Sequence, residues 1–347
     1  MISKQELLTS NITKNLANGM LDKMKLSTVL LKHGGFSGSG IILYGDVASR
    51  QAMVLTAAHN VLLAAKGSAD FPGYPINWQN SDILKHSQTL LNYFKTNVKI
   101  HYRALDDTQA QNEAEKQLQS LKMKGITKNQ TFSEPKAKNG VANMVAANLI
   151  NTGDWTTDLC LLRFSYAENE VPRASLLGPR DRTHLQSLLQ NQMNFISELK
   201  KYATSTKRVS GLRDYQFFQF GYGKPSTDTG DDYTATLDNL KYRVIEPEGT
   251  DHYRAIVCED GEMVKEYQDV LLFQSDTQNT SLPGDSGGPV FAFQQATTAP
   301  EIFLLGVNLG SDFFKPHQAP SDSQSAPTGK YNNAITSAYA AFERLHG

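Results

Sequence analysis

The chain has 347 residues, and its 34 Lys and Arg nearly balance its 35 Asp and Glu, giving a formal net charge of −1. Without an excess of positive charge, we expect neither nucleic acid nor an anionic membrane surface as a partner. All-β chains often exceed about 200 residues as one unit, so this length is compatible with a single domain.

The chain contains two cysteines, Cys160 and Cys258, which are too few for a disulfide framework and favour a reducing compartment. Cys160 lies in an apolar run, where we expect a buried thiol that packs as a small hydrophobic residue. The first residues lack the long apolar segment of a signal peptide, and the chain has no apolar stretch of membrane-spanning length. We therefore predict a cytoplasmic protein, or one exported without a Sec signal.

The N-terminal part predicts one helix followed by strands. Apolar residues recur at helical intervals over residues 4–25, which predicts a short helix packed on the domain. A glycine-rich flexible turn is expected over residues 34–40. The predicted strands are residues 27–32, 41–44 and 53–56, and the third leads to His59.

The segment between His59 and Asp158 covers 99 positions (158 − 59 = 99), more than a few strands of about 5–6 residues need. Residues 106–124 combine an i, i+4, i+8, i+11 apolar stripe with many Glu, Gln and Lys residues, which predicts an inserted helix. This helix is either a solvated decoration or an element that docks a partner or steers substrate.

Beyond Asp158 the pattern alternates between apolar strands and two further helices. Helices are predicted over residues 183–202 and 333–345, and a non-periodic stretch rich in Ser, Pro and Gln predicts a mobile loop over residues 311–329. The predicted strands are residues 159–164, 215–223, 233–245, 270–275 and 302–307.

Three motifs carry the chemistry. Gly284-Asp285-Ser286-Gly287-Gly288-Pro289-Val290-Phe291 predicts a tight turn that presents one hydroxyl, because glycine permits positive φ and close backbone approach. One apolar run is followed by Thr56-Ala57-Ala58-His59. A second apolar run is part of Thr157-Asp158-Leu159-Cys160-Leu161-Leu162. The order His, Asp, Ser is one in which a base, an orienting acid and a nucleophile occur.

These motifs resemble those of the trypsin/chymotrypsin family of serine endopeptidases. The resemblance implies an all-β fold of two six-stranded antiparallel β-barrels, with the active site in the cleft between them. It also implies a single peptidase domain over residues 1–347. Its expected parts are an N-terminal helical extension (1–25), a first barrel (26–180), a helical linker (181–210), a second barrel (211–330) and a C-terminal helix (331–347).

The resemblance also implies the role of each site residue. Ser286 would be the nucleophile, His59 the general base and acid, and Asp158 the carboxylate that orients His59. The backbone N–H groups of Gly284 and Ser286 would form the oxyanion hole. Such acyl-enzyme chemistry needs neither a metal nor an organic cofactor, and its substrate would be a protein or peptide.

Asp285 departs from the usual family pattern. In many members the equivalent acid pairs with a new N-terminal amine exposed by cleavage, but no matching Ile-Val-Gly-Gly-like sequence precedes the first barrel. We therefore hypothesise that activation does not follow the trypsinogen route. Asp285 would instead pair with an internal donor, or stay mobile until a partner orders the loop.

Substrate preference is weakly encoded. Thr280 stands where trypsin-like members carry an Asp at the base of the primary pocket, so a neutral pocket for a small or medium side chain is expected. Asn308, Leu309 and Gly310 would form the wall strand, whose backbone pairs with the substrate. Leu309 stands where an aromatic residue is common.

Two rival functions remain at this stage. The chain could be a catalytically silent or latent trypsin-fold binding protein, with a regulatory protein partner that orders the oxyanion loop. It could also be an esterase or other acyl hydrolase, although its motif and residue order differ from those of α/β-hydrolases. The low cysteine content and the lack of a signal indicate a bacterial or bacterial-effector protease with few protein targets.

Overall fold

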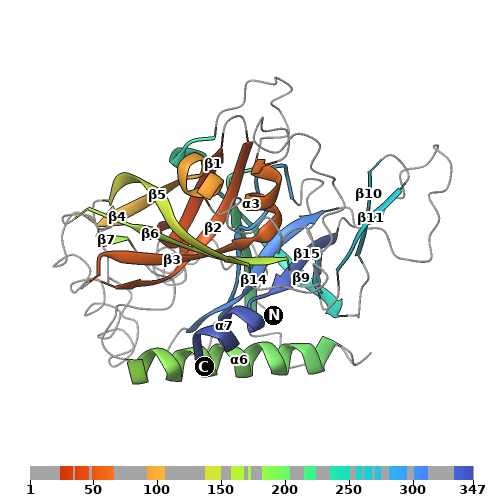
Figure 1. The fold of residues 1–347 in the computed structure, drawn as a ribbon. Helices are drawn as coiled ribbons and strands as arrows, with labels where there is room; N and C mark the ends of the chain where they lie inside the picture. Colours follow the sequence, from red (N-terminus) through yellow and green to blue (C-terminus); the bar gives the residue numbers. More distant parts are fainter. Residues whose placement is uncertain are drawn as a thin grey trace.

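The computed structural model is mostly β, with few helices (Figure 1). It describes residues 24–33, 36–46, 49–65, 92–105, 137–149, 158–167, 171–172, 182–203, 215–223, 235–250, 255–259, 262–267, 270–274, 281–294, 301–311 and 332–346.

The N-terminal half forms a seven-stranded antiparallel sheet in the order β1-β2-β3-β6-β5-β4-β7, and β1 also pairs with β4 over three residue pairs. Its strands are rich in apolar and β-branched residues, which suit a buried pleated surface. The strands are β1 (Thr28–His33), β2 (Phe36–Asp46), β3 (Gln51–Ala57), β4 (Lys99–Leu105), β5 (Ala137–Leu149), β6 (Leu159–Ser165) and β7 (Val171–Pro172).

The C-terminal half forms a closed six-stranded barrel in the order β12-β15-β14-β13-β8-β9. Phenylalanines dominate its core, with Phe217 against Phe273 and Phe220 against Phe291 at ring-centroid distances of 5.5 and 5.9 Å. The strands are β8 (Tyr215–Gly221), β9 (Lys241–Thr250), β12 (Val270–Gln274), β13 (Pro289–Gln294), β14 (Glu301–Ser311) and β15 (Asn332–Ser337).

A separate two-stranded hairpin, β10 (Ala255–Glu259) and β11 (Glu262–Tyr267), projects from the body of the molecule between β9 and β12 (Figure 1). The all-β class is therefore borne out as a mostly β structure. Of the two predicted six-stranded barrels, one is present as a closed barrel, and the other strands form the seven-stranded sheet.

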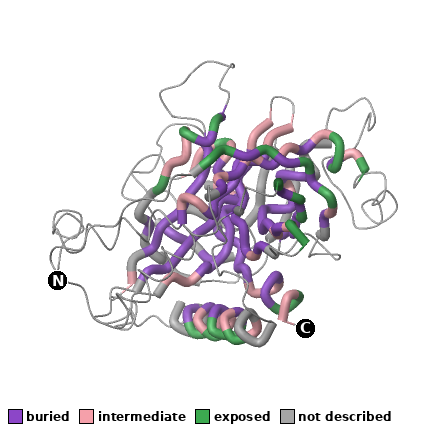
Figure 2. The backbone as a smooth tube through the Cα atoms, turned by 90° about the vertical axis from the view of Figure 1, so that its left-hand side faces the viewer, coloured by how far each residue is buried: buried purple, intermediate pink, exposed green. Residues whose placement is uncertain are grey.

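Helix α6 (Arg182–Ala203) lies along the outside of the barrel beside α7 (Tyr339–His346) (Figure 1). Its buried positions Leu189, Gln192, Ile196 and Leu199 follow one face, while the opposite face is exposed (Figure 2). This is the stripe of an amphipathic helix. In the described part of the chain, no helix combines the length and apolar character needed to cross a membrane.

Two predicted elements need correction. Residues 36–40 belong to β2 rather than to a turn, because they pair along β1. The predicted C-terminal helix starts only at Tyr339, since the preceding residues form β15, which pairs with both β12 and β14. The buried β-branched Ile335 and Thr336 fit that strand.

The remaining predicted elements are confirmed, confirmed only in part, or outside the described residues. The helix over 183–202 and the strands over 27–32, 53–56, 159–164, 215–223, 270–275 and 302–307 are confirmed within a few residues. The strand predicted over 233–245 begins only at Lys241. Residues 24–27 are helical, whereas the rest of the 4–25 helix, the 106–124 helix and most of the 311–329 loop lie outside the described residues.

Candidate active site

The pairing of β3 with β6 brings His59 and Asp158 together. Ala57, the last residue of β3, pairs with Leu159, the first residue of β6. His59 follows β3 by two residues, in the first turn of α3 (Ala58–Ala65), and Asp158 immediately precedes β6. Residues separated by 99 positions in sequence therefore meet at the same end of two neighbouring strands.

Both carboxylate oxygens of Asp158 bind His59. Oδ2 lies 2.6 Å from the ring nitrogen Nδ1, and Oδ1 accepts a hydrogen bond of 2.9 Å from the His59 backbone N–H. Because a carboxylate only accepts, the hydrogen of this contact lies on Nδ1, and in the neutral ring Nε2 is left as the acceptor. Asp158 is fully buried, whereas the His59 side chain is 13% exposed.

Asp158 also has an unusual backbone conformation. Its φ is 46°, in the left-handed region, which few residues other than glycine adopt and which Asp and Asn tolerate best. Its carbonyl oxygen accepts a 2.9 Å hydrogen bond from the N–H of Ala58. Backbone and side chain of Asp158 thus bind successive N–H groups at the start of α3, which would otherwise lack helical partners.

Ser286 is the second residue of the later of two consecutive glycine-dependent turns. Asp285 N–H donates to the Leu282 carbonyl, and Gly288 N–H donates to the Asp285 carbonyl, both at 2.9 Å. The third residues of these turns, Gly284 and Gly287, have φ of 100° and 79°, as type II turns require. The two turns account for the glycines at positions 284 and 287. They place Ser286 directly after Asp285, the residue that both turns share.

The backbone N–H groups of Gly284 and Ser286 are available to a ligand. Within the described residues, neither donates a hydrogen bond, although their neighbours do. Two unpaired N–H groups on one tight turn can meet negative charge on an oxygen atom.

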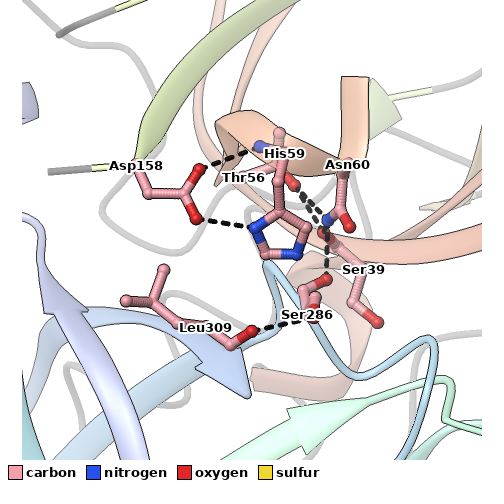
Figure 3. A network of polar contacts seen from close by, with 7 residues as sticks. All are labelled: Ser39, Thr56, His59, Asn60, Asp158, Ser286 and Leu309. Carbon is pink, nitrogen blue, oxygen red and sulfur yellow. Dashed lines mark hydrogen bonds and ion pairs between the residues drawn. The ribbon is translucent and has the colours of Figure 1, made fainter. Parts of the chain in front are cut away.

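The Ser286 hydroxyl donates to the Leu309 carbonyl oxygen at 3.0 Å. Figure 3 places Ser286 across the imidazole of His59 from Asp158, but no hydrogen bond between Ser286 and His59 is present among the described residues. A rotation about the Cα–Cβ bond of Ser286 would move its hydroxyl away from Leu309. Ligand-free sites often hold such contacts in a loose geometry.

Asp285 is fully buried and bound by internal donors. Its two oxygens accept hydrogen bonds from the N–H groups of Gly223, at 2.7 Å, and Leu282, at 3.0 Å. A Cβ on Gly223 would lie 2.5 Å from the Asp285 carboxyl carbon, and one on Gly221 would overlap the same group. The absence of side chains at these two glycines therefore makes room for the carboxylate.

The predicted substrate-binding residues differ in their surroundings. Thr280 lies outside the described residues. Asn308 is fully buried, and its Nδ2 donates to Ser281 Oγ at 2.6 Å, while its Oδ1 has no hydrogen-bond partner among the described residues. Leu309 is 5% exposed, Gly310 is half-buried, and only the Leu309 carbonyl contacts Ser286.

Sequence reasoning missed a polar cluster formed by Ser39, Thr56 and Asn60, which contacts the Ser286 turn (Figure 3). The available signals were the polar residue immediately after His59 and the serine within Gly38-Ser39-Gly40. Cys160 is buried, as expected. Within the described part of the chain, no group of three or more His, Cys, Asp or Glu is arranged to hold a metal ion.

Neither a family model nor a curated protein matches the chain. Among solved structures, it is similar to Rv3671c from M. tuberculosis H37Rv, a protease in its inactive form, with 14% identity over 94% of this chain and 89% of that one, at a TM-score of 0.38. It is also similar to Deg5 (13%, 86% and 85%, TM-score 0.36) and to a Glu endopeptidase (12%, 92% and 89%, TM-score 0.35). Identity and TM-score are low throughout, so the functional argument rests on the site itself.

Proposed function

We propose that the protein is a serine endopeptidase of the trypsin/chymotrypsin type, with Ser286 as nucleophile, His59 as general base and acid, and Asp158 as the orienting carboxylate. The observation that carries this proposal is the buried carboxylate bound to Nδ1 of a partly exposed imidazole, beside a serine held on a glycine turn. As part of the same proposal, the seven-stranded sheet corresponds to the first barrel of that family.

The residues divide the reaction between them. Once the Ser286 hydroxyl turns from Leu309, His59 Nε2 takes its proton while Oγ attacks the scissile carbonyl carbon. The imidazolium, stabilised by Asp158, then gives that proton to the leaving amine as the C–N bond breaks and the acyl-enzyme forms. A water molecule, which gives a proton to His59, then attacks the acyl-enzyme. The cleaved chain leaves as its carboxylic acid, and His59 returns the proton to Ser286.

The N–H groups of Gly284 and Ser286 would stabilise the oxygen that becomes negative in each tetrahedral intermediate. Among the residues that the structure describes, neither N–H has another partner, which supports this role. Removing one such donor typically costs about 100–1000-fold in rate. The turn hydrogen bonds hold both donors in place before substrate arrives, so these two N–H groups need no reorganisation during the reaction.

Substrate would lie along β14, at Leu309 and Gly310. We propose a neutral pocket for the side chain that precedes the scissile bond, with Thr280 and Asn308 among its residues. A peptide library read by mass spectrometry tests this pocket. We expect cleavage after small or medium neutral side chains, and dominant cleavage after Glu, Asp, Arg or Lys would refute the neutral pocket.

Labelling with a fluorophosphonate, read by mass spectrometry, tests the catalytic proposal. The intact protein should acquire one adduct on Ser286, and Ser286→Ala should acquire none while keeping the native unfolding midpoint. A folded native protein that is never labelled would favour the catalytically silent binding protein. A protein labelled only after a partner is added would favour the latent form.

A further inference from the structure

Asn60, the residue after His59, connects helix α3 directly to the turn of Ser286. Its Nδ2 donates to the Ser286 carbonyl oxygen at 2.7 Å, and it lies 3.0 Å from Thr56 Oγ1 and 3.3 Å from the Ser39 carbonyl oxygen (Figure 3). Asn60 is 3% exposed. All three contacts use the amide nitrogen, so the orientation of this carboxamide is defined by acceptors on three sides.

Ser39, on β2, binds the same turn through its backbone and its side chain. Its N–H donates to the Ser286 carbonyl at 2.8 Å, and its hydroxyl donates to the Gly284 carbonyl at 2.7 Å. The hydroxyl oxygen accepts a 3.0 Å hydrogen bond from the N–H of Tyr222. Thr56 Oγ1 in turn donates to the Ser39 carbonyl at 2.7 Å, which fixes Ser39 against β3.

Two glycines beside this polar cluster make room for the Asn60 amide. A Cβ on Gly38 would lie 2.7 Å from Asn60 Cγ, and one on Gly287 would lie 2.5 Å from Asn60 Nδ2. The chain therefore has glycine on both sides of the carboxamide. A side chain at either glycine would collide with the carboxamide in the position where it binds the Ser286 turn.

We infer that Asn60 and Ser39 are positioning residues for the proposed reaction. They hold the carbonyls of Ser286 and Gly284, and so fix the peptide planes that flank the two proposed oxyanion donors. Asn60 also sets the distance between nucleophile and base, because it adjoins His59 in α3. A displacement of about 1 Å in such a constellation can cost about 100-fold in rate.

This inference rests on the proposed function, and its test compares two buried carboxamides. Asn60→Ala removes the contacts to the turn. Gln192→Ala is the matched control, since Gln192 is also buried and bonds a backbone N–H, that of Leu304, at 2.7 Å. Gln192 lies on α6, on the outer side of the barrel and outside the proposed site.

Both variants should unfold at lower urea concentration than the native protein. Asn60→Ala should also lower kcat and the rate of fluorophosphonate labelling about 10- to 100-fold with KM changed less than about 3-fold, whereas Gln192→Ala should keep both rates within about 2-fold. Should Asn60→Ala fail to fold, Ser39→Ala removes only the hydroxyl contacts and should lower kcat in the same way. A folded Asn60→Ala or Ser39→Ala with native kcat would overturn the inference.

Hydrogen exchange separates this inference from the proposed function. If native protein is not labelled, the endopeptidase proposal fails, but the effect of Asn60 on the turn is still measurable. The backbone amides of residues 284–288 should then exchange faster in Asn60→Ala than in Gln192→Ala. Equal exchange in the two variants would show that Asn60 does not hold the turn.

Discussion

Gly287→Ala should be among the more damaging single-methyl additions in the chain. Gly287 has φ of 79°, and a left-handed conformation costs a non-glycine residue about 1–2 kcal/mol. The added Cβ would also overlap the Ser39 carbonyl and Thr56 Oγ1, and would lie 2.5 Å from Asn60 Nδ2. Overpacking of this kind costs about 1–3 kcal/mol, which gives a total of about 2–5 kcal/mol.

Gly284→Ala provides the matched comparison. Gly284 also has positive φ, 100°, but a Cβ there would have its nearest atoms, Ser37 Oγ and the Tyr222 carbonyl oxygen, at 3.2 Å. It should therefore lose about 1–2 kcal/mol, mainly from backbone strain. The entropic gain from replacing glycine by alanine in the unfolded chain is the same for both, so it cancels in the comparison.

Urea unfolding of the two variants, monitored by fluorescence, measures the difference. We expect Gly287→Ala to be the less stable variant by about 1–3 kcal/mol, the overpacking cost alone. Equal losses of stability would refute the reasoning, because they would mean that the polar cluster yields to an extra methyl group at no cost.

Three other changes test separate parts of the structure. Asp158→Asn keeps a residue that tolerates positive φ but removes the charge that holds the imidazole, so serine labelling should fall about 10⁴-fold, and a fall below tenfold would contradict the assigned role. Gln192→Leu leaves the buried N–H of Leu304 unpaired and should lower the free energy of unfolding by about 1–3 kcal/mol in urea titrations. Burial lowers the pKa of His33 and of His101, the latter further because of a nearby lysine. Since the unfolded chain then binds more protons below about pH 6.5, stability should decrease as the pH falls from about 7.5 to 5.5, and His101→Gln should reduce that slope in urea titrations at several pH values.

The placement of His59 and Asp158 could be predicted because each lies beside a strong strand pattern. The apolar runs before His59 and after Asp158 define β3 and β6, and the antiparallel register of these two strands brings the two residues together. The resemblance of the motifs predicted that His59 and Asp158 pair, and the pairing of β3 with β6 is the physical reason. Sequence alone did not indicate the left-handed φ of Asp158, since its neighbours have no turn residue that requires it.

The errors arise where partners far apart in sequence decide the local structure. Residues 333–345 have helical spacing, yet the first part becomes β15 because it pairs with β12 on one side and with β14 on the other, which closes the barrel. Tertiary pairing outweighs the local pattern in such cases. The Ser39 and Asn60 contacts are equally non-local, with Asn60 bound to Ser286 across 226 positions, and the local sequence does not indicate which distant residue they bind.

The Ser286 turn is held from two directions by groups of the chain itself. On one side Ser39 binds the carbonyls of Gly284 and Ser286, and on the other Gly223 donates its N–H to Asp285. The N–H of Tyr222, the residue before Gly223, binds Ser39, so one short segment after β8 contacts both sides of the turn.

These contacts bear on the choice between an active and a latent protein. Each intramolecular hydrogen bond contributes about 1 kcal/mol net, but a broken one would leave buried backbone groups unpaired at about 1–3 kcal/mol each. Disordering the turn would therefore be costly, and no group from outside the chain is needed to form it. The proposed oxyanion donors would thus be ready before substrate binds, and a regulatory partner, if one exists, would act more readily on access to Ser286 than on the order of its turn.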